Sequence, residues 1–435
     1  MMGGISAVDV SNDISVDESI ATDNMLVKDV CSLGDSGDVV DDVVSGDVCS
    51  LGDSSGVVEV DNEKGLLDAL SNDNVKEIKI IKDMQLSKSI TVPARWDLII
   101  DGQNHKISPG SNYVAQGAAL TWYAGRGHLN NCVFVGFKNT INDGEYGVYG
   151  GALAWRSTFG AITNCSFINC YSEHGGAIWT NFDIVITDCL FENNSADKGG
   201  AIYGNKAPLD VRNSIFKNNI AVEGGVFRCS AVFMETSKFY NNSANIGGVV
   251  WIEATFDVKN CSFENNSANG SGAVIYDVDN QDLYPGTSRC DGYIYDSNFT
   301  GNHAKKDGGA IYSEFIVHVN HSIFKNNVAD EGGAIFVKEI SYIESSKFIE
   351  NEACEKGGAI YSKYQVWVDD SSFEGNVAKN ASVYQCEGGA IYCGDESFGH
   401  DDFHGMILRN SNFTNNYAYD YGGALWQCDK GAVAR

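Results

Sequence analysis

The chain has 435 residues, with 58 acidic and 30 basic side chains and a formal net charge of −28. This length is too large for one ordinary globular core but is normal for a repeat protein, whose core grows with each added unit. The strong negative charge excludes a nucleic-acid-binding function, which needs a basic face.

Residues 1–56 are expected to form an acidic, disordered stalk or pro-segment. Residues 1–62 hold fourteen acidic side chains and one basic side chain, Lys28. A segment with so much charge and so few apolar residues cannot bury enough surface to fold. No complete signal peptide is visible, and no stretch approaches the roughly 18 apolar residues of a membrane span.

Two motifs alternate in fixed phase from Gly150 to Leu425. The first is Gly-Gly-Ala-Ile followed by an aromatic residue, as in 175–179 and 308–312. The second is Phe-x-x-Asn-x-Ala, as in 324–329. The usual step between copies of the first motif is 23 to 25 residues. A constant period of this size indicates a repeat architecture.

Each repeat contains three short segments whose apolar residues are spaced by two. In one repeat they are Ile184 and Ile186, then Cys189 and Phe191, then the Gly-Gly-Ala-Ile segment. A spacing of two is the period of a β-strand with one face turned inward, and no segment is long enough for a helix. Three strands in every 24 residues predict a triangular parallel β-helix whose rungs stack at about 4.8 Å.

Residues at equivalent positions of successive rungs should stack on one another. The Phe of the second motif should form one buried column, whose members are Phe191, Phe216, Phe239, Phe263, Phe299, Phe324, Phe348, Phe373 and Phe413. The Asn three residues later should form a ladder of amides bonded from rung to rung. The position two before each Phe is Cys or Ser, so several of the 13 cysteines serve as small inward side chains. Disulfide pairing of the others stays open.

Residues 57–131 are expected to form an N-terminal cap and the first rungs, and 132–435 the repeat domain. Asn62 or Asp61 could cap a short helix with Leu66, Leu67 and Leu70 on one face. Such a helix would cover the open first rung of a solenoid. The rung pattern continues almost to the C-terminus without a cap, so we expect a fragment of a longer protein.

The two motifs together resemble the repeats of chlamydial polymorphic outer membrane proteins and of methanogen adhesin-like surface proteins. The resemblance covers about residues 132–427. It implies a right-handed β-helix that is exposed at a cell surface and used in adhesion. The repeat motifs are structural, so the resemblance carries over no catalytic residues, and it implies no cofactor. The C-terminal membrane barrel of the chlamydial proteins and a visible anchor are both missing from the sequence.

Aromatic residues recur at two positions that should point away from the core. One follows the Ile of the first motif, and the other lies six residues before the motif Phe. The alternative is that these aromatics only reflect strand propensity. Insertions at about 277–291 and 394–405 should wall a shallow groove between them. The candidate ligand-binding residues are Tyr293, Tyr312, His318, Phe336, Tyr342, Tyr361 and Trp367.

Other chemical signals in the sequence are weak. Ten Asn-x-Ser/Thr sequons occur, but the repeat consensus Asn-Asn-Ser-Ala generates sequons automatically. Segments 400–404 and 277–282 contain clustered ligand-type side chains without the spacing of a zinc or EF-hand site. We expect no metal site and no cofactor. No outward position is expected to repeat acids on successive rungs, as paired-carboxylate catalysis would need.

The sequence therefore predicts an extracellular, non-enzymatic, adhesin-like module at a cell surface. Its expected partner is a glycan or a surface protein of a host or partner cell. The alternative is a carbohydrate-active β-helix enzyme, either a polysaccharide lyase or a glycoside hydrolase. Two or three carboxylates converging in one cleft would favour the enzyme.

Overall fold

The computed structural model describes residues 56–123, 125–140, 148–278, 291–380, 386–394 and 405–427. Contacts divide the chain into two units, Met1–Val48 and Cys49–Arg435, and every described residue belongs to the second. The predicted acidic segment therefore lies outside the described residues. The predicted boundaries at 56/57 and 131/132 stay predictions.

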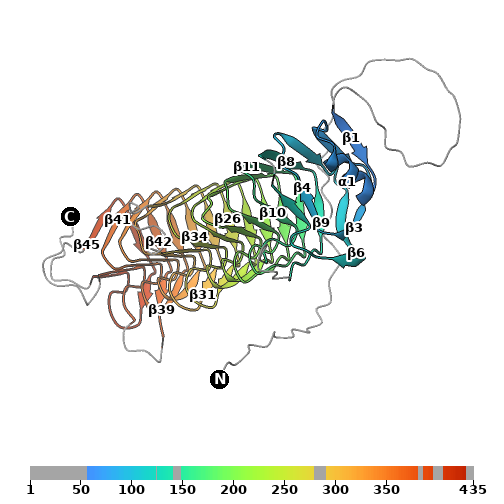
Figure 1. Cartoon of the computed structure of the whole chain (residues 1–435). Helices are drawn as coiled ribbons and strands as arrows, with labels where there is room; N and C mark the ends of the chain where they lie inside the picture. Colours follow the sequence, from blue (N-terminus) through green and yellow to red (C-terminus); the bar gives the residue numbers. More distant parts are fainter. Residues whose placement is uncertain are drawn as a thin grey trace, which may run out of the picture. The chain divides into compact units, whose positions relative to one another are not determined.

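The described unit is a parallel β-helix, as the repeat period predicts (Figure 1). Neighbouring strands within each sheet belong to successive turns of the chain, and the paired strands are parallel. The strands form four sheets, which we name A to D.

Sheet A contains β1 (Val57–Val60), β2 (Glu77–Ile80), β5 (Leu98–Asp101), β8 (Arg126–Asn130), β11 (Phe159–Thr163), β14 (Ile184–Thr187), β17 (Leu209–Arg212), β21 (Val232–Glu235), β25 (Phe256–Lys259), β29 (Gly292–Tyr295), β33 (Val317–Asn320), β37 (Ile340–Glu344), β41 (Gln365–Asp369) and β45 (Gly405–Arg409). Sheet B contains β3 (Met84–Lys88), β6 (Lys106–Val114), β9 (Val133–Val135), β12 (Ser166–Ile168), β15 (Leu190–Glu192), β18 (Ile215–Lys217), β22 (Lys238–Tyr240), β26 (Ser262–Glu264), β30 (Asn298–Thr300), β34 (Ile323–Lys325), β38 (Lys347–Ile349), β42 (Ser372–Glu374) and β46 (Asn412–Thr414).

Sheet C, built from the Gly-Gly-Ala-Ile motif, contains β4 (Ile90–Val92), β7 (Leu120–Trp122), β10 (Leu153–Trp155), β13 (Ile178–Thr180), β16 (Ile202–Gly204), β20 (Phe227–Cys229), β24 (Val250–Ile252), β28 (Ile275–Asp277), β32 (Ile311–Ser313), β36 (Ile335–Val337), β40 (Ile360–Ser362), β44 (Ile391–Cys393) and β48 (Leu425–Gln427). Sheet D is shorter and contains β19 (Ile220–Glu223), β23 (Ser243–Ile246), β27 (Ser267–Ala268), β31 (His303–Ala304), β35 (Val328–Glu331), β39 (Glu352–Lys356), β43 (Val377–Ala378) and β47 (Tyr417–Ala418).

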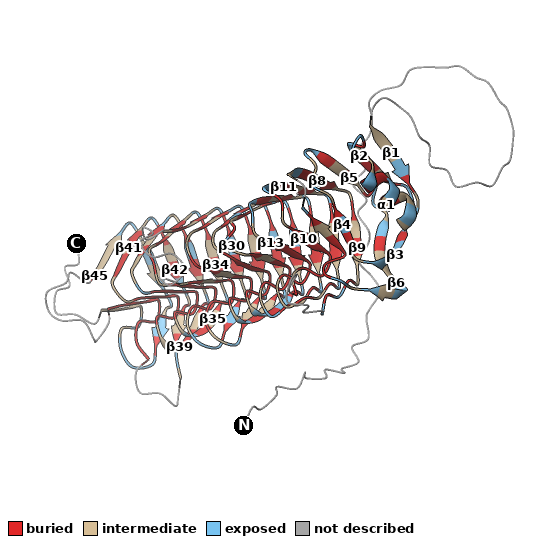
Figure 2. Cartoon of the chain, in the orientation of Figure 1, coloured by how far each residue is buried: buried red, intermediate tan, exposed pale blue. Residues whose placement is uncertain are grey.

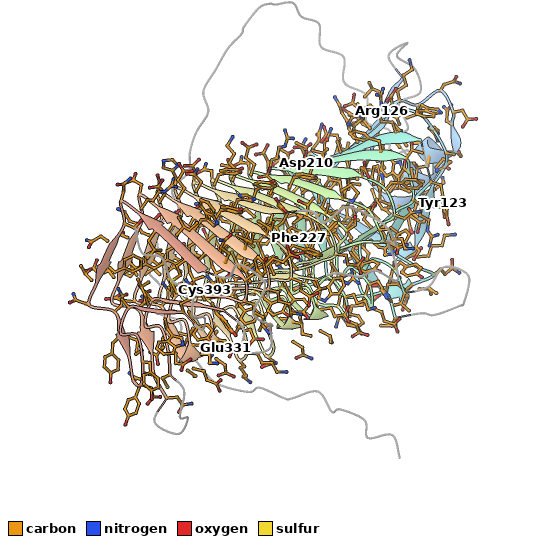
Figure 3. All side chains as sticks on the ribbon, turned by 90° about the vertical axis from the view of Figure 1, so that its left-hand side faces the viewer. Tyr123, Arg126, Asp210, Phe227, Glu331 and Cys393 are labelled. Atoms are coloured by element: carbon orange, nitrogen blue, oxygen red, sulfur yellow. The ribbon has the colours of Figure 1, made fainter. Side chains whose placement is uncertain are left out.

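The core is a continuous column of apolar side chains enclosed by the sheets (Figure 2). In Figure 3, Phe227 lies inside the coil between Asp210 and Glu331. The motif phenylalanines stack as predicted: the rings of Phe299 and Phe324 lie 4.5 Å apart and differ in plane by 1°. Phe413, in the last described rung, is half-buried, whereas the earlier members of the column are fully buried. The predicted inward Cys132, among others, is also buried, and the described cysteines are all free thiols.

The predicted asparagine ladder is also confirmed. Asn242 Oδ1 accepts hydrogen bonds from both the side-chain amide and the backbone N–H of Asn219, each at 3.0 Å. The same Asn219 amide donates to the carbonyl of Phe191 at 3.0 Å. Each amide of the ladder therefore satisfies polar groups of two rungs inside a dry interior, where an unpaired group would cost about 1–3 kcal/mol.

The glycine pair permits the close approach of successive rungs. The first glycine has a positive φ, +62° at Gly332, which L side chains rarely adopt. At the second glycine, a Cβ on Gly200 would lie only 2.1 Å from the carbonyl oxygen of Gly225 in the next rung. Backbone geometry therefore requires both glycines: the first because of its positive φ, and the second because no Cβ fits against the next rung.

Helix α1 (Glu63–Ser71) covers the first rungs, as predicted. Asn62 is its N-cap and accepts a hydrogen bond from the Gly65 N–H at 2.9 Å. Leu66 and Leu70 are buried in the continuous core, and Leu67 packs against it. The apolar stripe read from the sequence is the face that closes this end of the core.

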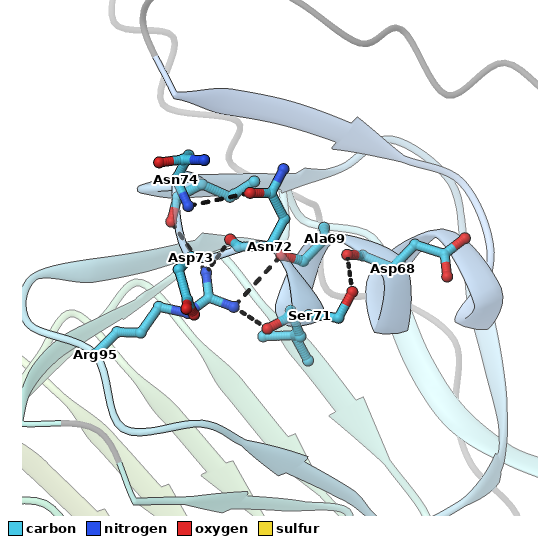
Figure 4. A network of polar contacts seen from close by, with 9 residues as sticks. Asp68, Ala69, Ser71, Asn72, Asp73, Asn74 and Arg95 are labelled. Atoms are coloured by element: carbon cyan, nitrogen blue, oxygen red, sulfur yellow. Dashed lines mark hydrogen bonds and ion pairs between the residues drawn. The ribbon is translucent and has the colours of Figure 1, made fainter.

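Arg95 ties the C-terminal end of the helix to the rung below (Figure 4). Its guanidinium donates to the carbonyls of Asn72 and Val75 at 2.8 and 3.1 Å and to that of Leu70. The last carbonyls of a helix have no partner within the helix. The Arg95 side chain, only 8% exposed, supplies one.

Sheet D was not predicted, because three strands were expected in each rung. Its strands follow the ladder asparagine, in segments such as Ser-Ala-Asn-Ile of β23, where one inward alanine replaces the large apolar side chains of the other sheets. Small and polar residues are typical of turns, so the sequence pattern hid an extended segment that is held by backbone pairing.

We predict that Phe324→Ala lowers the unfolding free energy by about 3–5 kcal/mol, because the ring is fully buried between two others and leaves a cavity. Phe413→Ala is the matched control and should cost clearly less, since that ring is half-buried at the end of the column. Urea unfolding followed by far-UV circular dichroism measures both. Equal losses of unfolding free energy in the two variants would contradict a continuous core at Phe324.

We predict that Arg95→Ala destabilises the capping helix by about 2–3 kcal/mol, because the carbonyls of Leu70, Asn72 and Val75, at the helix end and just after it, lose a charged donor at once. Backbone amides of residues 57–80 should exchange hydrogen faster, and those beyond residue 150 should keep their protection. Lys88→Ala, an exposed change on β3, should leave both regions unaffected. Uniformly faster exchange along the whole chain would show that Arg95 acts on more than the cap.

Candidate binding site

A column of four aromatic side chains runs along the outer face of sheet A. Tyr293, His318, Tyr342 and Trp367 occupy the same register on β29, β33, β37 and β41. The first two pairs of rings stack at 4.8 Å with planes 8° and 6° apart. Trp367 lies 5.9 Å from Tyr342 and is tilted by 36°. All four side chains are half-buried.

This stacking determines which part of each ring a ligand can meet. The faces of His318 are covered by its two neighbours, so the column presents mostly ring edges to solvent. Ring edges carry partial positive charge, whereas ring faces carry partial negative charge. Trp367 differs, because its tilt opens the stack and its partner in the next rung is Ile407.

A second column of side chains runs beside the first, two residues further along each strand. Its members are Tyr295, Asn320, Glu344, Asp369 and Arg409. Two residues of a strand span roughly 6.6 Å. The two columns therefore form the walls of a shallow groove of about 410 Å³ that follows the helix axis.

The groove contains both satisfied and unsatisfied polar groups. Asn320 donates to Glu344 Oε2 at 3.1 Å, and His318 Nε2 lies 3.1 Å from Asp291 Oδ2. Two buried polar atoms at the groove, Asn320 Oδ1 and Trp367 Nε1, have no hydrogen-bond partner among the described residues. One is an acceptor and the other a donor, and each costs about 1–3 kcal/mol when left unpaired.

The sheet C aromatics are not accessible, so this part of the predicted site is wrong. Tyr312, Phe336 and Tyr361 are 7%, 3% and 5% exposed. They do lie outside the main core, in a cluster of their own together with Tyr392. These side chains point away from the main core, as predicted, but they are not exposed to solvent.

Neighbouring side chains explain this burial. The ammonium of Lys338 lies 5.8 Å from the centre of the Tyr312 ring, and that of Lys363 lies 5.7 Å from the centre of Phe336. Long side chains from the next rung thus cover the rings of the rung before. Arg228, at the equivalent position of β20, is likewise only 9% exposed and is paired with Glu253 at 2.7 Å.

Sequence analysis missed a pair of stacked carboxylates. Asp307 and Glu331 each precede a Gly-Gly pair and bridge in successive rungs. Burial, followed by the neighbouring Asp307, raises the pKa of Glu331 to about 7. Burial also raises the pKa of Asp307, to whose carboxylate Ser271 donates at 3.4 Å. The expectation that no outward position repeats acids on successive rungs is therefore wrong. The acids could have been found in the sequence, because each directly precedes a Gly-Gly pair.

Several weaker candidates lie partly or wholly outside the described residues. These are the histidine cluster at 400–404, the acids at 279–282 and most of both insertions. Asp277 is described and is fully buried, and Ser313 donates to its carboxylate at 2.6 Å. Sequon residues such as Asn193 and Asn241 are exposed at turns with positive φ, and their modification stays untested.

The family model for the Chlamydia polymorphic membrane protein repeat matches six segments of the chain. The matched residues are 188–205, 260–277, 296–314, 321–338, 345–363 and 370–394. The chain thus carries repeats of this type, and the resemblance read from its two motifs is confirmed. A search of curated proteins found no match.

The solved structure of L. reuteri 53608 SRRP shares 11% sequence identity with this chain, over 85% of this chain and 99% of that one. The TM-score is 0.24. Within the described residues, no helix has the length and apolar character needed to cross a bilayer.

We predict that stability falls as pH rises from about 4.5 to about 7, in part because of Glu331. The folded pKa is raised from 4.5, so in this window the folded state holds a proton that the unfolded state has released. Glu331→Gln should flatten this part of the curve and stabilise the protein at pH 8. Urea midpoints between pH 4 and 8 measure the slope.

The control is Glu374→Gln, at an exposed position of β42, which should leave the slope unchanged. If Glu331→Gln keeps the full slope, the proton resides on another group.

Proposed function

We propose that this protein is an extracellular adhesin-like module that binds a glycan or a surface protein of another cell, without cleaving it, through the groove on sheet A. The observation that supports this most is the pair of columns that line the groove. One presents aromatic edges and a tilted tryptophan, and the other presents hydrogen-bonding side chains. Grooves with aromatic walls and a few placed polar groups are typical ligand sites.

The surroundings of the groove also support binding rather than catalysis. Of its acids, Glu344 accepts a hydrogen bond from Asn320, and Asp369 accepts one from Asn410 at 3.2 Å. Both side chains lie on the open face of a sheet rather than in an enclosed, dry cleft. A catalytic acid normally needs such a cleft to hold its proton near neutral pH.

A second candidate function is carbohydrate chemistry at Asp307 and Glu331. The specific observation is a carboxyl group with a pKa of about 7 beside a second carboxylate, which is a combination found in glycosidases. These residues lie outside the groove on sheet A. Release of reducing ends or unsaturated products from a polysaccharide panel, lost in Glu331→Gln, would establish this activity.

We predict that the double variant Tyr342→Ala/Trp367→Ala loses at least about tenfold in affinity for the natural target cell or glycan. Both side chains are half-buried on the outer face, so the thermal midpoint should change little. A glycan array and a cell-adhesion assay measure binding. The matched control is Phe233→Ala, an exposed aromatic of sheet A that lies outside the groove and should leave binding unchanged. Normal adhesion by the double variant would remove the groove from consideration.

A further inference from the structure

We infer that the groove on sheet A binds a linear, uncharged glycan that runs along the helix axis, with about one sugar residue per rung. This inference rests on the proposed function and specifies its ligand. It is supported by three features of the groove: the spacing of its walls, the charge of its side chains, and the tilt of Trp367.

The first support is the period of the walls. Four successive strands, β33, β37, β41 and β45, each contribute one residue to each wall, and Tyr295 of β29 extends the polar wall by one rung. Equivalent side chains therefore recur at the rung spacing of about 4.8 Å. One pyranose ring with its glycosidic bond advances a linear glycan by a similar distance. Successive sugars can thus meet equivalent side chains.

An extended peptide fits this period poorly. A peptide advances about 3.4 Å per residue along its axis, and its side chains on one face recur at twice that distance. Neither distance matches the rung spacing, so a peptide lying along the groove would lose register within a few residues. A protein ligand could touch the groove at single points but could not use its repeated walls.

The second support is charge. Glu344 and Asp369 stand in the polar wall, and Asp291 lies beside His318, whereas the described cationic residue of the wall is Arg409 at one end. An anionic polymer such as a polyuronate would place carboxylates against these acids at each rung, in a protein of net charge −28. Uncharged hydroxyl groups instead can donate to the carboxylates of Glu344 and Asp369.

The third support is the tilt of Trp367, whose ring plane lies at 36° to that of Tyr342. The tilt of Trp367 allows one sugar face to stack there, while sugars over His318 and Tyr342 meet ring edges.

The experiment is calorimetric titration of the whole chain with β-1,4-linked oligomers of glucose, mannose, xylose and N-acetylglucosamine, two to six units long. Oligogalacturonates of equal length serve as the anionic comparison. For one neutral series we expect affinity to rise by roughly three- to tenfold for each sugar up to four, as hydrogen bonds are added rung by rung, and then to level off. Oligogalacturonates should not bind.

The double variant Glu344→Gln/Asp369→Asn removes the negative charge while keeping the shape and hydrogen-bonding capacity of the wall. It should bind the neutral tetramer within about threefold of the native affinity and should gain measurable affinity for the tetragalacturonate. Trp367→Ala should abolish both. Phe233→Ala again should change neither.

Three results would overturn the inference: no neutral series binds, affinity does not depend on length up to four sugars, or native protein prefers the galacturonates. Failure of this inference can be distinguished from failure of the proposed function. If Tyr342→Ala/Trp367→Ala still abolishes adhesion to cells while every neutral glycan fails to bind, the groove is an adhesion site for a different ligand. If the double variant adheres normally, the groove is not the adhesion site at all.

Discussion

The in-register contact of one rung with the next is the constraint on which the whole β-helix depends. At the glycine pair, the carbonyl oxygen of Gly225 approaches the Cα of Gly200 so closely that no side chain fits between them. At the corner between sheets B and D, each ladder amide, such as Asn219, bonds both the rung before and the rung after. With both corners fixed, the strands between them cannot shift in register, and every side chain must stack on its equivalent in the next rung.

Stacking of equivalent residues explains why the described surface of this protein carries columns of like side chains. Aromatic residues at one register position cover one another, so a run of aromatics buries its own ring faces and leaves only edges exposed. Distinct chemical properties then arise where the residue type changes along a column or where two acids stack in it. Trp367 tilts because an isoleucine follows it. Burial, followed by the neighbouring acid Asp307 in the same column, raises the pKa of Glu331 to about 7.

The sequence predicted the features that each repeat specifies by itself. The phenylalanine column and the asparagine ladder follow from a residue that recurs at one position, and the capping helix follows from Asn62 and its leucine stripe. The burial of Tyr312 could not be predicted in this way, because the lysine that covers it, Lys338, belongs to a different register position of the next rung. The direction of a side chain follows from its own strand, whereas its exposure to solvent depends on the side chains of several strands. Sheet D was missed because its strands are held by backbone pairing and carry no apolar side-chain pattern.

The same separation of scaffold and surface explains how such a fold can acquire a binding specificity. The inward residue of each strand, the ladder amide and the glycine pair carry the stability, and none of them is a side chain of the groove walls. Outward positions such as 344 and 369 can change charge with little effect on the free energy of unfolding, because their neighbours are solvent and the equivalent side chains of adjacent rungs. The spacing of the walls, in contrast, is set by the backbone and cannot change. If the groove binds a glycan as we infer, the chemistry of its walls can therefore change at each rung, but the repeat distance that the ligand must match cannot.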